Sequence, residues 1–83
     1  MPVRSLQVRF FAVLREQAGC SAVEVNSAAG NAGALYAELQ QRFPGLVFPE
    51  RLLRVSINER YAPMHAALNA GDCVVFIPPI AGG

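Results

Sequence analysis

Residues 73–83, with the sequence CVVFIPPIAGG, decide how the rest of the chain is interpreted. The first five are apolar and mostly β-branched or aromatic, which predicts a strand. Neither proline can donate a backbone hydrogen bond, so strand pairing stops at Pro78 and the chain continues as a stiff, extended arm. Gly82 and Gly83 place no Cβ beside the terminal carboxylate, which can therefore enter a narrow slot. The pattern predicts a tail, residues 78–83, that presents this carboxylate. A frayed terminus without function is the alternative.

The composition predicts one small folded domain over residues 1–83. Apolar residues make up 53% of the chain and charged residues 16%, which is too hydrophobic for a disordered protein. The formal net charge is +1 and the seven arginines are scattered, so we expect neither nucleic acid nor a membrane surface as a partner. The chain has no lysine, so it cannot carry a partner on a side-chain amine of its own.

The N-terminal residues and the cysteines favour a cytoplasmic protein. The apolar run from Phe10 to Leu14 is too short for a signal peptide and is closed by Arg15, and no stretch is long enough to span a bilayer. Cys20 and Cys73 have neither CxxC nor Cys/His spacing, which predicts reduced thiols and no metal site. We therefore expect a cytoplasmic protein with no bound metal or cofactor.

Hydrophobic periodicity predicts an α+β chain with one main helix on a mixed sheet. Leu35, Leu39 and Phe43 recur at i, i+4 and i+8 in a helix for which Asn31 is a plausible N-cap, and this stripe is expected to pack on the sheet. A short helix over residues 12–18 should end at Gly19. Strands are predicted over residues 3–11, 21–26, 53–58 and 73–77, a loop over 46–50, a turn over 58–60, and an irregular segment or single helical turn over 61–68.

Strand parity predicts an apolar patch at the root of the tail. If Val74 and Phe76 face the helix, then Val75 and Ile77 point to the opposite side of the sheet. Phe11 falls on the polar face of the first strand. Were the first and last strands neighbours, these three outward side chains would form one exposed patch, which usually marks a partner surface. Local packing against a loop is the alternative.

The sequence shows no catalytic constellation among its side chains. Paired carboxylates, a Ser/His/Asp set, a phosphate-binding glycine loop and a metal cluster are all missing from its motifs. The terminal carboxylate is ionised at neutral pH and is a poor electrophile. Another enzyme could convert it to an acyl-adenylate, from which a sulfur nucleophile displaces the nucleotide.

Four motifs spread over essentially the whole chain match a known family. They are Arg9-Phe10-Phe11-Ala12 with Leu14-Arg15-Glu16 and Gly19, the central Val55-Ser56-Ile57-Asn58, then Leu68-Asn69-Ala70-Gly71-Asp72 followed by Val74, and the ending Ile77-Pro78-Pro79-Ile80-Ala81-Gly82-Gly83. Together they resemble the MoaD type of ubiquitin-like sulfur carrier, the small subunits of molybdopterin synthase in the MoaD/ThiS family. The resemblance implies a β-grasp (ubiquitin-like) fold, in which the first and last strands lie side by side at the sheet centre.

The resemblance also implies a reaction cycle in which the chain is not an enzyme on its own. A ubiquitin-activating-type adenylyltransferase uses ATP to adenylate Gly83, and a sulfurtransferase system replaces the adenylate with sulfur. The resulting thiocarboxylate enters the catalytic pocket of the large synthase subunit and gives sulfur to cyclic pyranopterin monophosphate, in molybdenum cofactor biosynthesis. Two carriers and two large subunits form the family's heterotetramer.

The family's functional residues carry over to this sequence position by position. Gly82 and Gly83 are the carrier end, and the preceding tail consists of Pro78, Pro79, Ile80 and Ala81. Phe11 and Ile77 would contact the partners, together with Val75 from the patch predicted by parity. Arg15 would help to meet the activating enzyme.

Three other functions stay open from the sequence. A sulfur carrier for thiamine thiazole or for cysteine synthesis shares the fold and the tail chemistry, although the thiazole carriers typically lack Pro-Pro before the last four residues. A protein modifier would be conjugated through Gly83 to lysines of its targets. A plain interaction module would use the tail for no chemistry, so deletion of Gly83 should change little in that case alone.

Overall fold

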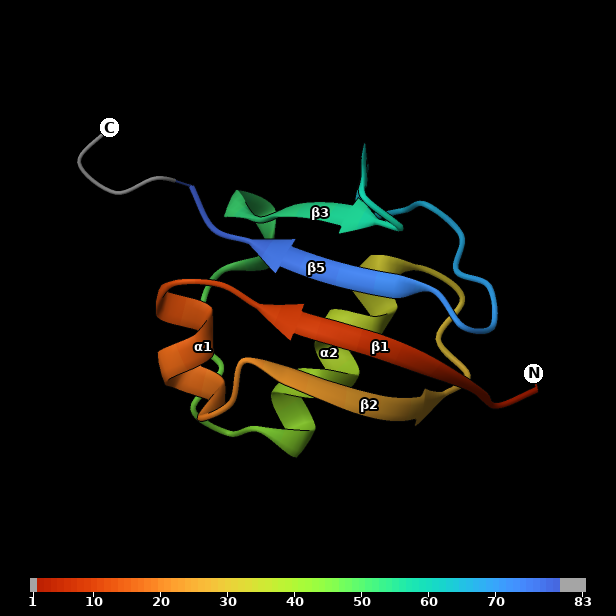
Figure 1. The fold of residues 1–83 in the computed structure, drawn as a ribbon. Helices are drawn as coiled ribbons and strands as arrows, with labels where there is room; N and C mark the ends of the chain where they lie inside the picture. The colour runs from red at the N-terminus through yellow and green to blue at the C-terminus, as the bar shows by residue number, and fades with distance from the viewer. Residues whose placement is uncertain (1, 80–83) are drawn as a thin grey trace.

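The computed structural model describes residues 2–79 and places the first and last strands side by side at the centre of a five-stranded sheet. The two central strands, β1 (Arg4–Phe10) and β5 (Cys73–Ile77), run parallel, with Phe10 opposite Phe76. Antiparallel strands flank them: β2 (Ala22–Ser27) beside β1, β3 (Arg54–Ile57) beside β5, and β4 (Arg60–Ala62) at the edge beyond β3. Figure 1 shows β1 and β5 between β2 and β3, which confirms the predicted adjacency.

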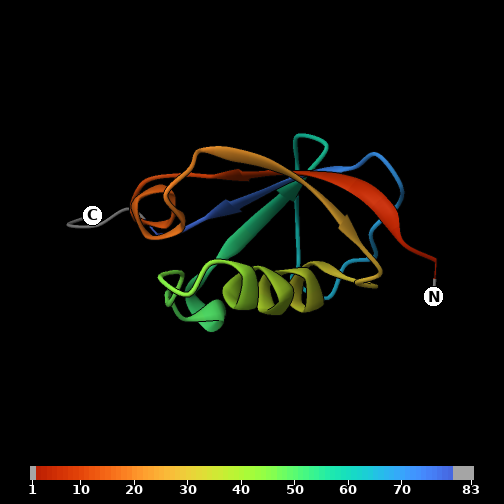
Figure 2. The same ribbon diagram turned by 90° about the horizontal axis from the view of Figure 1, so that it is seen from below.

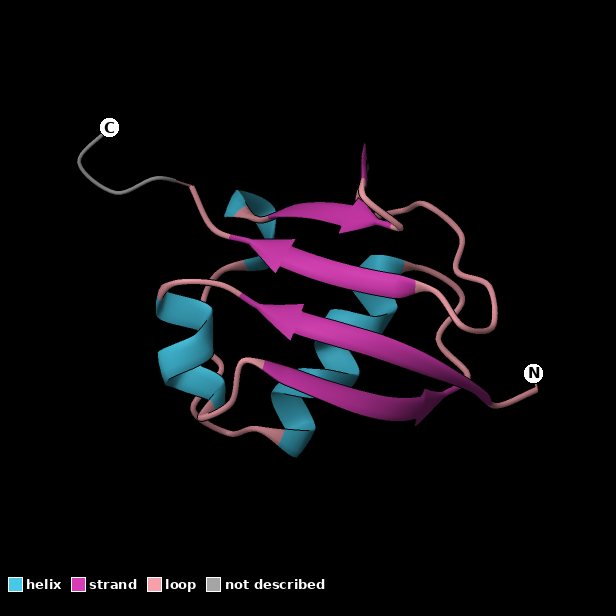
Figure 3. Cartoon of the chain, viewed as in Figure 1, coloured by secondary structure: helices cyan, strands magenta, loops and turns pink. Residues whose placement is uncertain are grey.

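Helix α2 (Ala32–Arg42) covers one face of the sheet, as Figure 2 shows. Its N-cap is Asn31, whose Oδ1 accepts a hydrogen bond from the N–H of Ala34 at 2.8 Å, as predicted. Two shorter helices, α1 (Val13–Ala18) and the 3₁₀ helix η1 (Glu50–Leu52), lie towards the end of the sheet where β5 ends; Figure 3 separates helices from strands by colour. One main helix against a mixed sheet in this order is the β-grasp, an α+β fold.

The core joins the inward face of the central strands to the apolar stripe of α2. The rings of Phe10 and Phe76 stack with their centroids 6.5 Å apart, and the ring of Tyr36 lies 5.2 Å from that of Phe76. Leu35 and Leu39 are buried beside them, so the predicted stripe of α2 does pack on the sheet. Burial of each such side chain stabilises the fold by about 1.5–3 kcal/mol.

The β3–β4 hairpin differs from the sequence prediction. We expect a turn over residues 58–60 and an irregular segment over 61–68, but Arg60–Ala62 forms strand β4 and pairs with β3. The turn itself is confined to Asn58 and Glu59, with φ of 54° and 70°. A two-residue hairpin turn of this kind usually carries glycine at its second position. Because glutamate stands there, the hairpin signal is weak in the sequence.

Smaller differences concern the ends of elements. Residue 11 lies outside β1, which ends at Phe10, and α1 begins at Val13 because Ala12 has a non-helical backbone. The 3₁₀ helix η1 begins inside the predicted loop over residues 46–50, directly after Pro49, whose fixed φ suits a helix entrance.

Asn58 and Asp72 connect the hairpin turn to the start of β5. The Nδ2 group of Asn58 donates to Oδ1 of Asp72 at 2.8 Å, and Oδ1 of Asn58 accepts from the N–H of Cys73 at 2.9 Å. The other carboxylate oxygen of Asp72 accepts from the N–H of Asn69 at 2.8 Å, and Asp72 is buried. These bonds fix where β5 begins in the sheet. Because the strand is short and regular, they also help to fix where it ends, at Ile77.

Candidate functional site at the root of the tail

An apolar groove, named here the tail-root groove, lies where β5 ends. Pro78 is buried and Pro79 is exposed, so the described chain passes from the interior to the surface over these two residues. Figure 1 shows this end of β5 on the same side of the molecule as α1. The groove has a volume of about 510 Å³ and is lined by Phe11, Ala12, Val13, Phe48, Ile77, Pro78 and Pro79.

A strained peptide at Ala12 shapes one side of this groove. Its φ is 53° and its ψ is −127°, a conformation that residues with a Cβ seldom adopt. The bend turns the chain from β1 directly into α1, where the N–H of Leu14 donates to the carbonyl of Phe11 at 3.1 Å. The side chain of Phe11 stays 51% exposed instead of entering the core.

The open face of the sheet, opposite α2, carries the predicted apolar patch. Val75 and Ile77 are partly buried and alternate with the buried Val74 and Phe76, as parity predicts. Phe11 lines the tail-root groove with Ile77 and also lines a second hollow with Val75. The structure therefore brings Phe11, Val75 and Ile77 together in one apolar strip, a name we keep for these three residues.

Two guanidinium groups flank the apolar strip. Arg9 of β1 stands opposite Val75 in the register of the sheet, and Arg54 of β3 stands opposite Ile77. Both arginines are exposed. The strip is therefore an apolar centre whose rim carries two arginines, and the acidic Glu59 also lines the second hollow. Such a surface suits a partner that offers an apolar patch with charged neighbours.

The remaining predicted site residues are placed differently. Arg15 is exposed on α1 and lines neither the tail-root groove nor the second hollow. Of the predicted tail, only Pro78 and Pro79 fall within the described residues. Ile80, Ala81, Gly82 and Gly83 lie outside them.

Phe48 also lines the tail-root groove, although the sequence does not predict it as a site residue. Its loop is held by Gln17, whose Oε1 accepts hydrogen bonds from the N–H groups of Val47 and Phe48 at 3.0 and 3.1 Å. The hydroxyl of Tyr36 donates to the carbonyl of Phe48 at 2.8 Å. Burial, and secondarily the negative charge of Glu50, raises the pKa of Tyr36 to about 12, so this donor stays protonated. Contacts between residues this far apart leave no local signal in the sequence.

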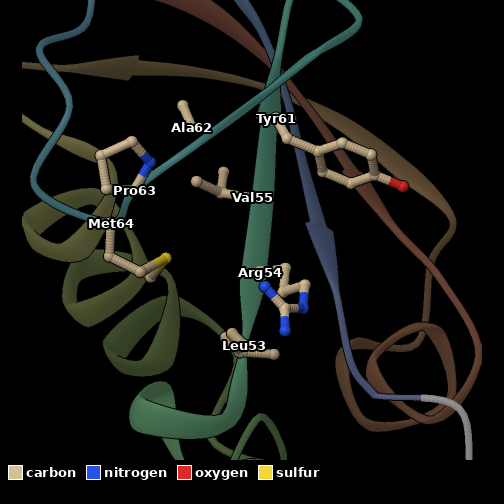
Figure 4. Close-up of a pocket in the computed structure, with 7 residues that line it drawn as sticks. All are labelled: Leu53, Arg54, Val55, Tyr61, Ala62, Pro63 and Met64. Carbon is tan, nitrogen blue, oxygen red and sulfur yellow. The ribbon is translucent and has the colours of Figure 1, made fainter.

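Another hollow, of about 520 Å³, lies along the β3–β4 hairpin (Figure 4). Arg54 and Tyr61 extend to one side of β3 and Met64 lies on the other. Tyr61 is 80% exposed, and apart from it and Arg54 the lining side chains are apolar. This hollow offers no pair of groups for acid–base or nucleophilic chemistry.

Within residues 2–79, no three His, Cys, Asp or Glu side chains gather closely enough to hold a metal ion. Cys20 and Cys73 are both free thiols and both are partly buried. Over the same part of the chain, no helix has the length and apolar character needed to cross a membrane.

Comparisons with known proteins agree with this geometry. The model of the ThiS family matches residues 8–83. The molybdopterin synthase sulfur carrier subunit of Haemophilus influenzae is 34% identical over 80 residues, which cover 94% of this chain and 99% of that protein. The crystal structure of SAMP1 from Haloferax volcanii superposes with a TM-score of 0.79 at 30% identity, covering 95% of this chain and 99% of that one.

A more distant structure shares the fold. It is the complex of subunits 1 and 2 of the molybdopterin-converting factor from Helicobacter pylori, with a TM-score of 0.64 at 24% identity, covering 95% of this chain and 99% of that chain. The central parallel strands, the antiparallel flanks and the single main helix thus define a ubiquitin-like β-grasp protein. Because the family model spans nearly the whole sequence, the chain belongs to the ThiS family, the ThiS/MoaD group of sulfur carriers. The resemblance found in the sequence motifs is confirmed.

Proposed function

We propose that this protein is the sulfur-carrier subunit of a molybdopterin synthase, one domain over residues 1–83 with residues 78–83 as an extended tail. The carboxylate of Gly83 attacks the α-phosphorus of ATP on a ubiquitin-activating-type adenylyltransferase, and pyrophosphate leaves. Hydrosulfide supplied by a sulfurtransferase system then attacks the acyl carbon, AMP leaves, and the thioacid loses its proton. The Gly83 thiocarboxylate so formed donates its sulfur to cyclic pyranopterin monophosphate, in molybdenum cofactor biosynthesis.

The observation that carries this proposal is the likeness to the Haemophilus influenzae sulfur carrier subunit over nearly the full length of both chains. The family match that extends to Gly83 supports it. The geometry is consistent with the role, because the last described residue, Pro79, is at the surface two residues after the end of the central strand β5. Gly82 and Gly83 then put no side chain beside the carboxylate.

The body of the protein has the task of presenting the tail to its partners. We propose that the apolar strip, Phe11, Val75 and Ile77, contacts the large synthase subunit and the activating enzyme, and that Arg15 contacts the activating enzyme. The catalytic pocket then belongs to the large subunit, with two carriers and two large subunits in a heterotetramer. The cycle takes place in the cytoplasm, where thiols and a thiocarboxylate persist.

A second candidate function is protein modification. The likeness to SAMP1, which belongs to the small archaeal modifier proteins, favours it, since that structure is 30% identical to this chain. In this role the activated Gly83 carbonyl would form an isopeptide bond with a lysine of a target. A sulfur carrier for thiamine thiazole or cysteine synthesis is a further alternative with the same tail chemistry, although Pro78-Pro79 is untypical of the thiazole carriers.

The first test is the intact mass of the protein incubated with its activating enzyme, ATP and a sulfur donor. A gain equal to one oxygen replaced by sulfur, abolished by deletion of Gly83, is expected of a thiocarboxylate carrier. A mass that stays unmodified in the complete system would contradict every carrier function. Gly83 recovered in isopeptide linkage to other proteins would instead favour the modifier.

A second test separates the carriers from one another. The thiocarboxylated protein is mixed with the large synthase subunit and cyclic pyranopterin monophosphate, and formation of the dithiolene product is followed with loss of sulfur from Gly83. Sulfur loss only in the presence of a thiazole-forming or cysteine-forming enzyme would assign the carrier to that pathway instead.

A further inference from the structure

The loop between α2 and η1 contains two neighbouring backbone donors that one side chain satisfies. The N–H groups of Val47 and Phe48 both donate to Oε1 of Gln17, at 3.0 and 3.1 Å. An amide oxygen has two lone pairs, so a single glutamine can accept both bonds. Gln17 belongs to α1 and lies 30 and 31 residues from its two partners. Gln17 therefore connects α1 to the loop between α2 and η1.

Two further contacts hold the same loop in place. The Tyr36 hydroxyl donates to the carbonyl of Phe48 at 2.8 Å, which fixes the loop from the side of α2. Gly45 lies so close to α1 that a Cβ built on it would stand 2.7 Å from the backbone oxygen of Gln17. The side chain and the backbone of Gln17 thus both define where residues 45–48 run.

The held loop builds a wall of the tail-root groove. Phe48 lines the groove together with Phe11, Ala12 and Val13 of the β1–α1 bend and with Ile77, Pro78 and Pro79. Pro78 is buried and Pro79 is exposed, so the described chain reaches the surface beside this groove. Displacement of Phe48 would therefore change the shape of the groove that Pro78 and Pro79 also line.

We propose that Gln17 is a positioning residue for the tail: by clamping the Phe48 loop, it fixes the shape of the groove in which the tail begins at Pro78 and Pro79. The inference rests on the proposed function, in which the activating enzyme must receive the Gly83 carboxylate in line with its nucleotide. Fixing the approach of a reacting group in advance removes part of the entropy cost of reaction, and small misplacements are costly in rate.

The test compares two substitutions of the clamp in the full-length protein. Gln17→Met keeps the length of the side chain but removes the acceptor, whereas Gln17→Glu keeps an oxygen that accepts both N–H groups. We expect Gln17→Met to lower kcat/KM for adenylation by the activating enzyme about tenfold, and Gln17→Glu to restore it to within about twofold of wild type. Amide hydrogen exchange at Val47 and Phe48 should accelerate in the Met variant only.

A matched control separates positioning from loss of stability. Ser27→Ala breaks the hydrogen bonds of the Ser27 hydroxyl with Glu38 and with the N–H of Ala29, at the end of the sheet far from the groove. It should lower stability by as much as Gln17→Met does and leave kcat/KM unchanged. Phe48→Leu, which keeps an apolar core contact and shortens the wall, should reproduce the Met effect even if Gln17→Met folds poorly.

Three outcomes would overturn the proposal. Equal kcat/KM for wild type and Gln17→Met would show that the clamp does not position the tail. An equal loss of kcat/KM in Ser27→Ala would show that the effect of Gln17→Met comes from lower stability and not from positioning. Failure of the wild-type protein to be adenylated at all would refute the proposed function and the positioning role with it, which distinguishes that case from the other two.

Discussion

The Ala12→Gly substitution should stabilise this protein, although glycine usually destabilises a folded chain. The backbone of Ala12, with φ of 53° and ψ of −127°, lies in a region that glycine occupies freely and residues with a Cβ seldom enter. The side chain of Ala12 is exposed, so its removal costs no core packing. The substitution therefore tests the strain at the β1–α1 bend with little else changed.

The expected magnitude follows from two opposing contributions. A residue held in a sparsely populated backbone region carries about 1–3 kcal/mol of strain, which glycine would relieve. Glycine also gives the unfolded chain more conformational freedom, which lowers stability by about 0.4–1 kcal/mol. The difference predicts an increase of about 1 kcal/mol in the free energy of unfolding. For a domain of this size that corresponds to a rise in Tm of about 4–8 °C.

The measurement is urea unfolding followed by circular dichroism, with the m-value compared between variants. The matched control is Ala37→Gly, an exposed alanine inside α2 with helical backbone geometry, which should lose about 1 kcal/mol. If Ala12→Gly loses as much stability as Ala37→Gly, then Ala12 is not strained and the bend has another origin. Equal m-values are needed for either comparison to report on the folded state.

Three further predictions concern other parts of the fold. The pKa of Tyr36 is raised from 10.0 to about 12, so the stabilisation by its protonated phenol is complete below pH 10 and is lost as the pH rises towards 12. The free energy of unfolding should fall by about 2–3 kcal/mol over this range, and Tyr36→Phe should not show this fall. Gly45→Ala would place its Cβ 2.7 Å from the backbone oxygen of Gln17, and should lower the free energy of unfolding by about 1–3 kcal/mol; an unchanged Tm would contradict this close approach. Asp72→Ala leaves the Asn58 amide without its partner and should cost about 2–4 kcal/mol, with a coupling of at least about 1 kcal/mol to Asn58→Ala in a double-mutant cycle; additive losses would show that the two side chains act separately.

Local chemistry predicts the elements of this chain well where one residue type dominates. Proline at positions 78 and 79 ends β5 where the structure ends it, and the leucine stripe of α2 packs on the sheet. Parity along β5 placed Val75 and Ile77 on the open face without knowledge of the strand order. That β5 lies beside β1 came from the resemblance and not from pattern, because nothing in either strand specifies its neighbour.

What the sequence could not predict depends on contacts between distant residues or on unusual backbone. The clamp of Gln17 on the Phe48 loop joins segments about 30 residues apart, and glutamine in a short helix reads as an ordinary surface residue. The hairpin turn at Asn58 and Glu59 requires two positive φ values. A glycine at the second position would have indicated this turn in the sequence. The bend at Ala12 is similarly hidden, since alanine between an aromatic strand and a helix favours helix.

The central pair of strands explains why the stable core and the proposed partner surface occupy the same segment. Side chains alternate strictly along a strand, so the burial of Val74 and Phe76 against α2 forces Val75 and Ile77 onto the open face. Exposure of apolar side chains on the open face does not stabilise the fold. A sheet face without a partner usually carries polar residues, as positions 5, 7 and 9 of β1 do. Val75 and Ile77 lie next to Phe11, and Ile77 immediately precedes Pro78. The central strand β5 therefore carries both core residues and the apolar surface beside the start of the tail. A partner seated on the apolar strip would therefore contact the tail at its origin, which fits the proposed delivery of the Gly83 carboxylate.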